Sequence, residues 1–134
     1  MKDITDQLIV SKGNGVGTIK FNNQARRNAM TFEMWEGLGI VVEDFNTDPD
    51  VRVIVVSGEG GKAFCAGADI SQFAEKRSSE DAVAIYNAAT DNSTQLLATA
   101  AKPTIAKIEG FCIGGGMGIA MCCDIRIAND QATF

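Results

Sequence analysis

The feature that most constrains the fold is a strand followed by three glycines and a short apolar helix, between Ile105 and Asp124. Its residues read IAKIEGFCIGGGMGIAMCCD. A helix that begins directly after glycines presents N–H groups that have no carbonyl partner, at the positive end of its dipole. Such groups bind phosphates, carboxylates or the oxyanion of a reacting carbonyl. The stretch therefore predicts an anion-binding or oxyanion-stabilising turn.

The composition indicates a globular protein with little attraction for nucleic acid. The chain has 134 residues, of which 46% are apolar and 22% charged, so we expect one domain over residues 1–134. The net charge is −5 and no Lys/Arg cluster occurs, which argues against a nucleic-acid partner. The sequence shows no membrane-spanning run and no signal-peptide core, so we expect no membrane partner and a cytoplasmic location.

The chain contains no histidine and four cysteines. The absence of histidine excludes Ser-His-Asp and Cys-His catalysis and histidine metal sites. The cysteines lie in apolar or small-residue runs without a Cys-x-x-Cys pair, so we predict buried free thiols and no metal site. They are Cys65, Cys112, Cys122 and Cys123. Acid/base chemistry is therefore left to carboxylates, Lys, Tyr or water.

Strand and helix patterns alternate along the chain. The predicted strands are Leu8–Ser11 and Val16–Phe21 around a Gly-Asn-Gly turn, Val51–Ser57 (apolar enough to be covered on both faces), Thr104–Glu109 and Asp124–Ala128. Three helices are predicted between these strands, in addition to the short one after the triple glycine. The first begins after the cap Thr31 and runs through Phe45, the second spans Gln72–Lys76 with Asp69 or Ser71 as its cap, and the third spans Ala82–Ala101. This alternation predicts an α/β fold with largely parallel strands.

Two glycine-containing loops lie between the third strand and the fourth. The first, Gly58–Lys62, is not a Walker loop because Ala63 follows Lys62 and the glycine spacing is wrong. The second, Ala66–Ala68, follows the first and is built of small residues that permit close backbone approach. The second loop and the triple-glycine turn both place backbone N–H groups where a ligand can approach, and two converging donors suit a thioester oxyanion. Either turn alone is more often only a tight-turn or packing device.

Three motifs resemble those of the crotonase superfamily, the enoyl-CoA hydratase/isomerase family. Lys62–Ile70 (KAFCAGADI) resembles the first signature and Lys102–Gly116 resembles the second. Arg27–Met30, just before the first long helix, resembles a third recurrent element. Their order and spacing also fit, and the resemblance covers essentially the whole chain. It implies the N-terminal portion of a right-handed spiral of ββα units, with the family's C-terminal helical part absent.

The resemblance also implies a ligand and a set of site residues. The ligand would be an acyl-CoA thioester, with coenzyme A as part of the substrate and no other cofactor. The N–H groups of Ala68 and Gly115 would form the oxyanion hole. Residues 66–70 and the glycine turn would line the substrate path: Ala66, Gly67, Asp69, Ile70 and Gly114. Arg26 or Arg27 would lie near the CoA phosphates, with a solvated loop as the equal alternative, and the full-length form would be a homotrimer or hexamer.

Departures from the family pattern leave the reaction open. Gly118 stands where hydratases of this family carry their first glutamate, and the second would fall just past Phe134. Asp124 and Asp69 are better explained as structural residues, and Glu109 as a strand-end residue facing solvent. We therefore expect an acyl-CoA-processing enzyme, with a non-catalytic acyl-CoA-binding or assembly module as the alternative. A Rossmann-like nucleotide binder is disfavoured because no Gly-x-Gly-x-x-Gly follows the first strand.

Overall fold

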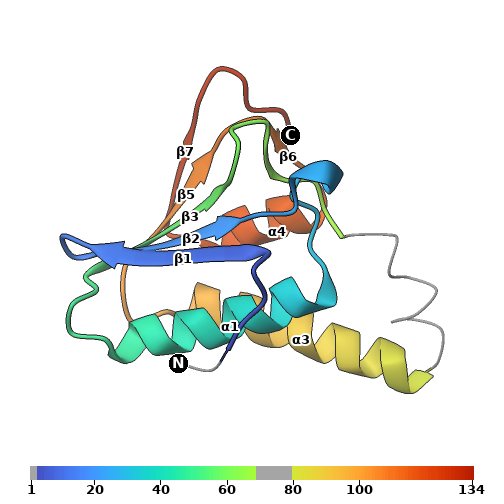
Figure 1. Ribbon diagram of the computed structural model, residues 1–134, viewed down its shortest axis with the longest axis horizontal. Coiled ribbons are helices and arrows are strands. Elements are labelled where there is room, and N and C mark those ends of the chain that lie inside the picture. The colour runs from blue at the N-terminus through green and yellow to red at the C-terminus, as the bar shows by residue number, and fades with distance from the viewer. Residues whose placement is uncertain (1–2, 69–79) are drawn as a thin grey trace.

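The computed structural model describes residues 3–68 and 80–134, and Figure 1 shows their arrangement. A five-stranded sheet has the order β1-β2-β3-β5-β7, and a two-stranded sheet pairs β4 with β6. The strands are β1 Leu8–Gly13, β2 Val16–Phe21, β3 Val53–Gly58, β4 Ala63–Cys65, β5 Thr104–Ile108, β6 Phe111–Cys112 and β7 Ile125–Ala128. The helices are the short 3-10 helix η1 Gln24–Arg26 and the α-helices α1 Phe32–Thr47, α3 Glu80–Ala98 and α4 Gly115–Cys122.

The large sheet confirms the predicted topology. Strands β1 and β2 form the expected antiparallel hairpin, with Asn14 (φ 55°) and Gly15 (φ 82°) in the turn. Every later pairing in this sheet is parallel: β2 with β3, β3 with β5, and β5 with β7. Parallel strands need long crossover connections, and the helices supply them here. The α/β prediction with largely parallel strands is therefore confirmed.

Helix α1 lies against α3 below the large sheet (Figure 1). Its N-terminus is capped as the sequence predicts, because the Thr31 hydroxyl accepts a hydrogen bond from the N–H of Met34 at 3.2 Å. The residues of its inner face are buried: Met34, Trp35, Leu38, Val41, Val42 and Phe45. Helix α3 ends at Ala98 rather than at the predicted Ala101.

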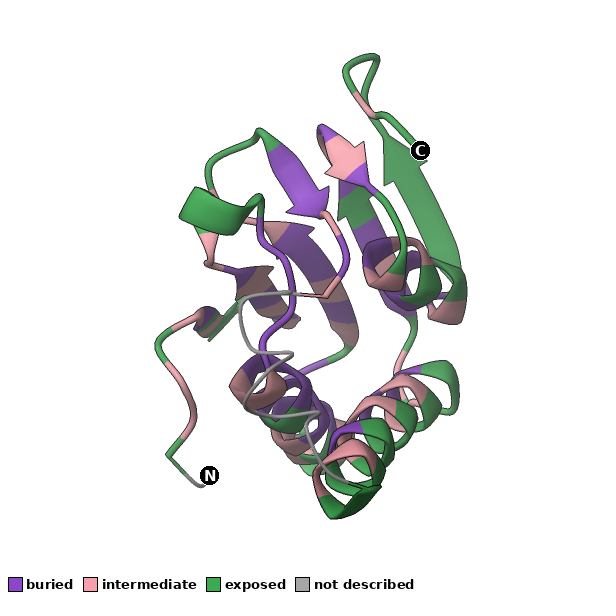
Figure 2. Ribbon diagram, turned by 90° about the vertical axis from the view of Figure 1, so that its right-hand side faces the viewer, coloured by how far each residue is buried: buried purple, intermediate pink, exposed green. Residues whose placement is uncertain are grey.

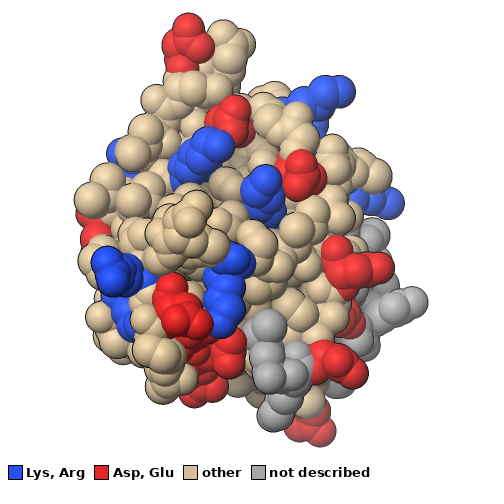
Figure 3. All heavy atoms as spheres, turned by 60° about the vertical axis from the view of Figure 1, so that its left-hand side comes forward, with Lys and Arg blue, Asp and Glu red and all other residues tan. Residues whose placement is uncertain are grey.

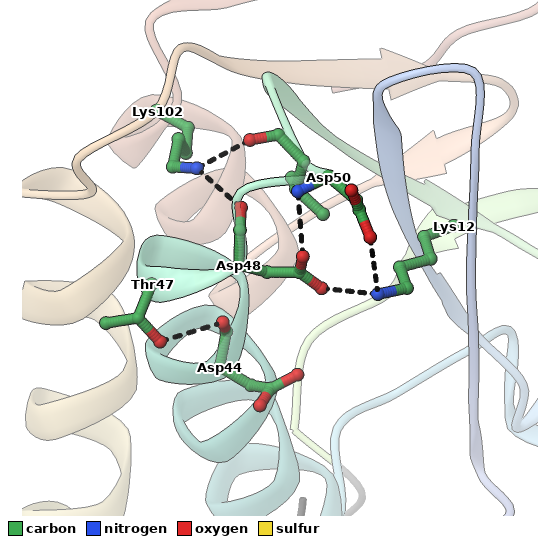
Figure 4. A network of polar contacts seen from close by, with 7 residues as sticks. Lys12, Asp44, Thr47, Asp48, Asp50 and Lys102 are labelled. Atoms are coloured by element: carbon green, nitrogen blue, oxygen red, sulfur yellow. Dashed lines mark hydrogen bonds and ion pairs between the residues drawn. The ribbon is translucent and has the colours of Figure 1, made fainter.

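Polar contacts fix the loop between α1 and β3 (Figure 4). The ammonium of Lys12 lies 2.7 Å from a carboxylate oxygen of Asp48 and 3.7 Å from one of Asp50. Lys102 donates to the backbone carbonyls of Asp48 (2.9 Å) and Val51 (2.5 Å). These bonds hold the residues before β3 outside the ladder, so the strand begins at Val53 and not at Val51.

In the central strand β3, only one face is fully buried, which corrects the prediction of cover on both faces. In β3, Ile54 and Val56 are buried, whereas Val53 and Val55 on the opposite face are half-buried. Val55 pairs with Ile105, and Ile105 pairs with Ile125, so this half-covered face continues to the edge strand. Strand β7 is exposed along its whole length (Figure 2). The apolar run of β3 therefore reflects its central position in the sheet rather than cover on both faces.

The small sheet was not predicted from the sequence. Strands β4 and β6 have three and two residues and lie inside segments that the composition marks as turns. They pair in parallel, with Ala63 opposite Phe111 and Cys65 opposite Cys112.

The predicted helix at residues 72–76 lies outside the described residues. Charged side chains of both signs are interspersed on the face shown in Figure 3.

Candidate functional site

The two small-residue turns, at Gly67 and at Gly114, lie next to each other. A Cβ added to Gly114 would stand 3.6 Å from the Cα of Gly67. A Cβ added to Gly67 would stand 3.6 Å from the carbonyl oxygen of Ile113 and 3.9 Å from the nitrogen of Gly115. Both glycines also have positive φ, 106° at Gly67 and 58° at Gly114, which side chains rarely tolerate. An added methyl group would meet only ordinary contact distances, so the positive φ is what favours glycine at these two positions.

Backbone hydrogen bonds join these turns to the loop before α1. The N–H of Ile113 donates to the carbonyl of Cys65 at 3.1 Å. The N–H of Ala66 donates to the backbone carbonyl of Arg27 at 3.0 Å, and the N–H of Met30 donates to the carbonyl of Gly67 at 2.6 Å. All three motifs that carry the family resemblance therefore meet at one place in the fold, although they are far apart in sequence.

Two amide groups at this junction have no protein acceptor among residues 3–68 and 80–134. They are the N–H groups of Ala68, which follows Gly67, and of Gly115, the first residue of α4. A Cβ on Gly115 would lie 3.7 Å from the carbonyl carbon of Gly67, the atom bonded to the Ala68 nitrogen. The structure thus places Gly115 beside the Gly67–Ala68 peptide, and Ala68 and Gly115 are the two residues that the sequence motifs indicated.

Close packing anchors the start of α4. A Cβ added to Gly116 would overlap the carbonyl oxygen of Cys65, so the helix backbone lies directly against β4. Two residues further on, a Cβ added to Gly118 would meet nothing within 4 Å. Gly116 is therefore required by packing, whereas Gly118 leaves open space where a side chain would fit.

Trp35 is a further residue at this junction, which the sequence analysis did not single out. Its ring atoms Cζ2 and Cη2 lie 3.3 and 3.6 Å from the position that a Cβ on Gly115 would occupy. The indole N–H donates to the hydroxyl of Tyr86 on α3 at 3.2 Å, and both side chains are buried. The available signal was a large aromatic residue beside the apolar face of α1, which alone indicates only core packing.

A surface cleft of about 460 Å³ opens beside the first motif, and two cationic side chains, Arg27 and Lys62, line it. Its lining residues are Gln24, Ala25, Arg27, Asn28, Glu59, Lys62, Ala63 and Phe111. The Arg27 guanidinium lies 4.7 Å above the centre of the Phe111 ring, within cation–π range. Arg26 lies on exposed η1 and does not line this cleft. Lys62, which the sequence analysis did not assign a role, joins Arg27 as a possible anion contact.

Asn28 locks the loops around this cleft. Its side-chain amide donates to the carbonyls of Ala63 at 2.8 Å and Glu59 at 3.2 Å, and its oxygen accepts the N–H of Asn23 at 2.9 Å. The residue is buried and has a positive φ of 59°, a conformation that asparagine adopts more readily than most residues. Its place in the motif is thus explained by structure.

The other candidate residues have structural roles or lie outside the described part. The Asp124 carboxylate accepts the N–H of Thr104 at 2.9 Å, and the Thr104 hydroxyl accepts the N–H of Asp124 at 2.8 Å, as expected of a structural aspartate. Glu109 is partly exposed and lies 3.8 Å from the Lys107 ammonium. Asp69 and Ile70 fall outside the described residues.

The four thiols are free, as predicted, but Cys122 is only half-buried, whereas the other three are buried. Burial raises the pKa of each of the four. The pKa of Cys65 rises to about 12 and that of Cys123 to about 11, chiefly because burial disfavours the thiolate. Neither is an activated nucleophile.

No group of three or more potential metal ligands occurs among residues 3–68 and 80–134. Within the same ranges, no helix has the length and apolar character needed to cross a bilayer.

Comparisons with known proteins identify the family. The family model described as enoyl-CoA hydratase/isomerase matches residues 11–134. The short-chain-enoyl-CoA hydratase of Clostridium acetobutylicum is 33% identical over 96% of this chain and 49% of its own length. The probable enoyl-CoA hydratase EchA14 of Mycobacterium tuberculosis is 37% identical, again over 96% of this chain and 49% of its own.

Solved structures agree with the sequence relatives. A putative enoyl-CoA hydratase/isomerase family protein from Hyphomonas neptunium superimposes with a TM-score of 0.90 at 34% identity, covering 98% of this chain and 50% of that one. The chain thus spans about half the length of the relatives it matches. The crotonase-like fold and the N-terminal portion predicted from the motifs are confirmed. By its matched residues and its fold, the chain belongs to the enoyl-CoA hydratase/isomerase family.

Proposed function

We propose that the chain binds an acyl-CoA thioester and stabilises the enolate of its carbonyl with the N–H groups of Ala68 and Gly115. The observation that carries this proposal is the contact between the Gly67 and Gly114 turns, which leaves two neighbouring amides without a protein acceptor among the described residues. The names of the relatives, which are enoyl-CoA hydratases, support the substrate class.

The physical basis is the negative charge that develops on the thioester oxygen when a proton leaves the neighbouring carbon. Fixed N–H donors stabilise that charge more than the neutral carbonyl, so they favour the reacting state over bound substrate. The Gly115 amide adds the positive end of the α4 dipole. Removal of one such donor typically costs about 3 to 4 kcal/mol of transition-state stabilisation.

The cleft beside the first motif supplies the proposed phosphate contacts. Arg27 and Lys62 both line it, and an anionic chain needs a local cation to hold the CoA phosphates. Residues 66–68 and Gly114 would then guide the pantetheine arm from the cleft to the two amides. In this proposal CoA is part of the substrate, and no separate cofactor takes part.

The proton-transfer step separates two candidate functions. Gly118 offers no carboxylate and has open space around it, so the described residues do not supply the usual glutamate there. An acyl-CoA-binding or assembly module is thus the second candidate. An assay of this chain with crotonyl-CoA distinguishes them: turnover above background supports the enzyme, whereas CoA binding without turnover supports the module. We place either function in the cytoplasm, within a homotrimer or hexamer at family length.

The role of the Gly115 amide is tested with Gly115→Pro and Gly115→Ala. Proline removes the N–H yet suits the first position of a helix, and alanine adds a comparable Cβ while keeping the N–H. The readout is the fraction of bound acetoacetyl-CoA present as enolate at a fixed pH. We expect that fraction to fall in the proline variant only, with the affinity for CoA itself unchanged. Equal enolate fractions in the two folded variants would refute the assignment.

A further inference from the structure

A buried pair of aromatic residues braces the glycine turn that carries one of the proposed donors. We propose that Trp35, held in place by Tyr86, is a positioning residue that fixes the Gly115 amide. This inference rests on the proposed function for its catalytic meaning, but the bracing itself is a property of the fold.

The turn needs external support because its own residues supply little. Gly114, Gly115 and Gly116 are consecutive, and glycine has more backbone freedom than any other residue. A donor stabilises an oxyanion well only if it is already oriented, since reorientation would cost free energy during the reaction. The turn must therefore be held by its neighbours.

Hydrogen bonds restrain the turn on both sides of Gly115 but not at its own amide. The N–H of Gly116 donates to Ile113 and that of Gly118 donates to Gly114, each at 3.0 Å. Trp35 lies on the side of Gly115 toward which a Cβ would point, with its ring edge 3.3 Å from that position. In our proposal, the ring edge limits rotation of the Gly114–Gly115 peptide toward this side and so supplies the restraint that the Gly115 amide lacks.

Tyr86 in turn fixes the indole. Its hydroxyl accepts the Trp35 N–H at 3.2 Å, and the two side chains retain only 3% and 6% exposure. The ring of Phe32 lies 6.3 Å from that of Tyr86 and adds a third aromatic contact. A buried indole N–H needs an acceptor, so the hydroxyl determines the tilt of the ring that touches Gly115. The bracing thus connects α3, α1 and the start of α4.

The same helix provides a matched control. Phe45 packs its ring against Gly17 in β2, where an added Cβ would lie 2.8 to 3.0 Å from three ring atoms. This is also an aromatic side chain of α1 on a glycine, but the glycine lies in a strand of the large sheet and not in either turn of the site. Phe45→Leu should therefore lower stability without affecting the Gly115 amide.

The experiment compares Tyr86→Phe, Trp35→Phe and Phe45→Leu with the unmodified chain. The readout is the enolate fraction of bound acetoacetyl-CoA, set against the affinity for free CoA. We expect the enolate-to-keto ratio to fall on the order of tenfold in the Tyr86 and Trp35 variants, since small displacements of catalytic groups have large effects. CoA affinity should stay within about twofold in every variant. An unchanged ratio in both variants, or an equal loss in Phe45→Leu, overturns the proposal.

A second measurement needs no ligand and separates this inference from the proposed function. Amide hydrogen exchange at Gly116 and Gly118 reports whether the turn opens. We expect about tenfold faster exchange at these two amides in Tyr86→Phe but not in Phe45→Leu, compared at equal global stability. If the unmodified chain fails to bind acetoacetyl-CoA while this pattern holds, the proposed function is wrong and the bracing is right. Identical exchange in the two variants refutes the bracing.

Discussion

Alanine substitutions at Gly116 and Gly118 should change stability in opposite directions. The two glycines lie two residues apart in the same short helix, so the intrinsic helix propensity of the substitution is the same, whereas Gly116 is buried and Gly118 is exposed. At position 118 an added methyl group meets nothing within 4 Å. At position 116 it would overlap the carbonyl oxygen of Cys65, a backbone atom that cannot rotate away. The perturbation is thus the same methyl group in two different surroundings.

The expected magnitudes follow from these surroundings. Replacing an exposed helical glycine by alanine stabilises a helix by about 0.8 to 1 kcal/mol. At Gly116 the same gain is opposed by a backbone overlap, and overpacking typically costs about 1 to 3 kcal/mol or more, so we expect a net loss of about 1 to 2 kcal/mol. A chain of 134 residues has an unfolding entropy near 0.28 kcal/mol/K. The expected shifts in Tm are therefore about +3 °C for Gly118→Ala and about −4 to −7 °C for Gly116→Ala.

Differential scanning calorimetry measures both shifts, and urea unfolding at 25 °C gives the corresponding free energies. The double variant should show the sum of the single effects within about 0.5 kcal/mol if the sites act independently. A Gly116→Ala variant as stable as the unmodified chain would show that α4 moves freely relative to β4. In that case the helix start is not held where the site requires it, and the packing argument fails.

Three further predictions concern a salt bridge, the thiols and a buried amide. The hydrogen bond from Lys12 holds the pKa of Asp48 below its ordinary value of 3.8, so the carboxylate's contribution to stability is present above that value and is lost as the pH falls through the lowered pKa. In urea unfolding between pH 2 and 7, the free energy of unfolding should therefore fall less steeply toward acid pH in Asp48→Asn than in the unmodified chain. The same slope in both would contradict this. Because burial raises the pKa of Cys65 to about 12, iodoacetamide at pH 8 should label Cys122 before Cys65 in the folded chain, as peptide mass spectrometry can show, and early labelling of Cys65 would count against the packing of β4. Asn28→Ala should lower the free energy of unfolding by about 2 to 4 kcal/mol because two carbonyls and an N–H lose their partner, whereas a loss below about 1 kcal/mol in urea unfolding would mean that water replaces the amide.

The sequence predicted the large sheet and its helices because those elements follow simple periodicities. The hairpin turn, the Thr31 cap and the strand before the triple glycine each rest on local chemistry and are found in the structure. The prediction that β3 is covered on both faces was wrong, because an all-apolar strand pattern does not reveal how much of each sheet face is packed. Strands β4 and β6 are too short to show any period, so nothing local could have predicted them.

The candidate site was predicted in part, for a related reason. The glycines of the two neighbouring turns, Gly67 and Gly114, are visible in sequence because a positive φ favours glycine. The neighbours of those glycines are not visible, because Trp35 and Lys62 reach the site through tertiary packing. Their residue types are common in ordinary cores and surfaces, so only the three-dimensional packing distinguishes them.

The meeting of three distant segments at the turns has a consequence for folding thermodynamics. No single segment contains both amides, and the Arg27–Met30 loop forms hydrogen bonds on both sides of the Gly67 turn. A ligand that needs both amides can therefore recognise only the assembled chain, and its binding adds directly to the free energy of unfolding. Saturation at a hundred times Kd should add about 2.7 kcal/mol, which for this chain length corresponds to roughly 10 °C in Tm. Thermal shift with a panel of acyl-CoA thioesters thus ranks substrates even where turnover is undetectable.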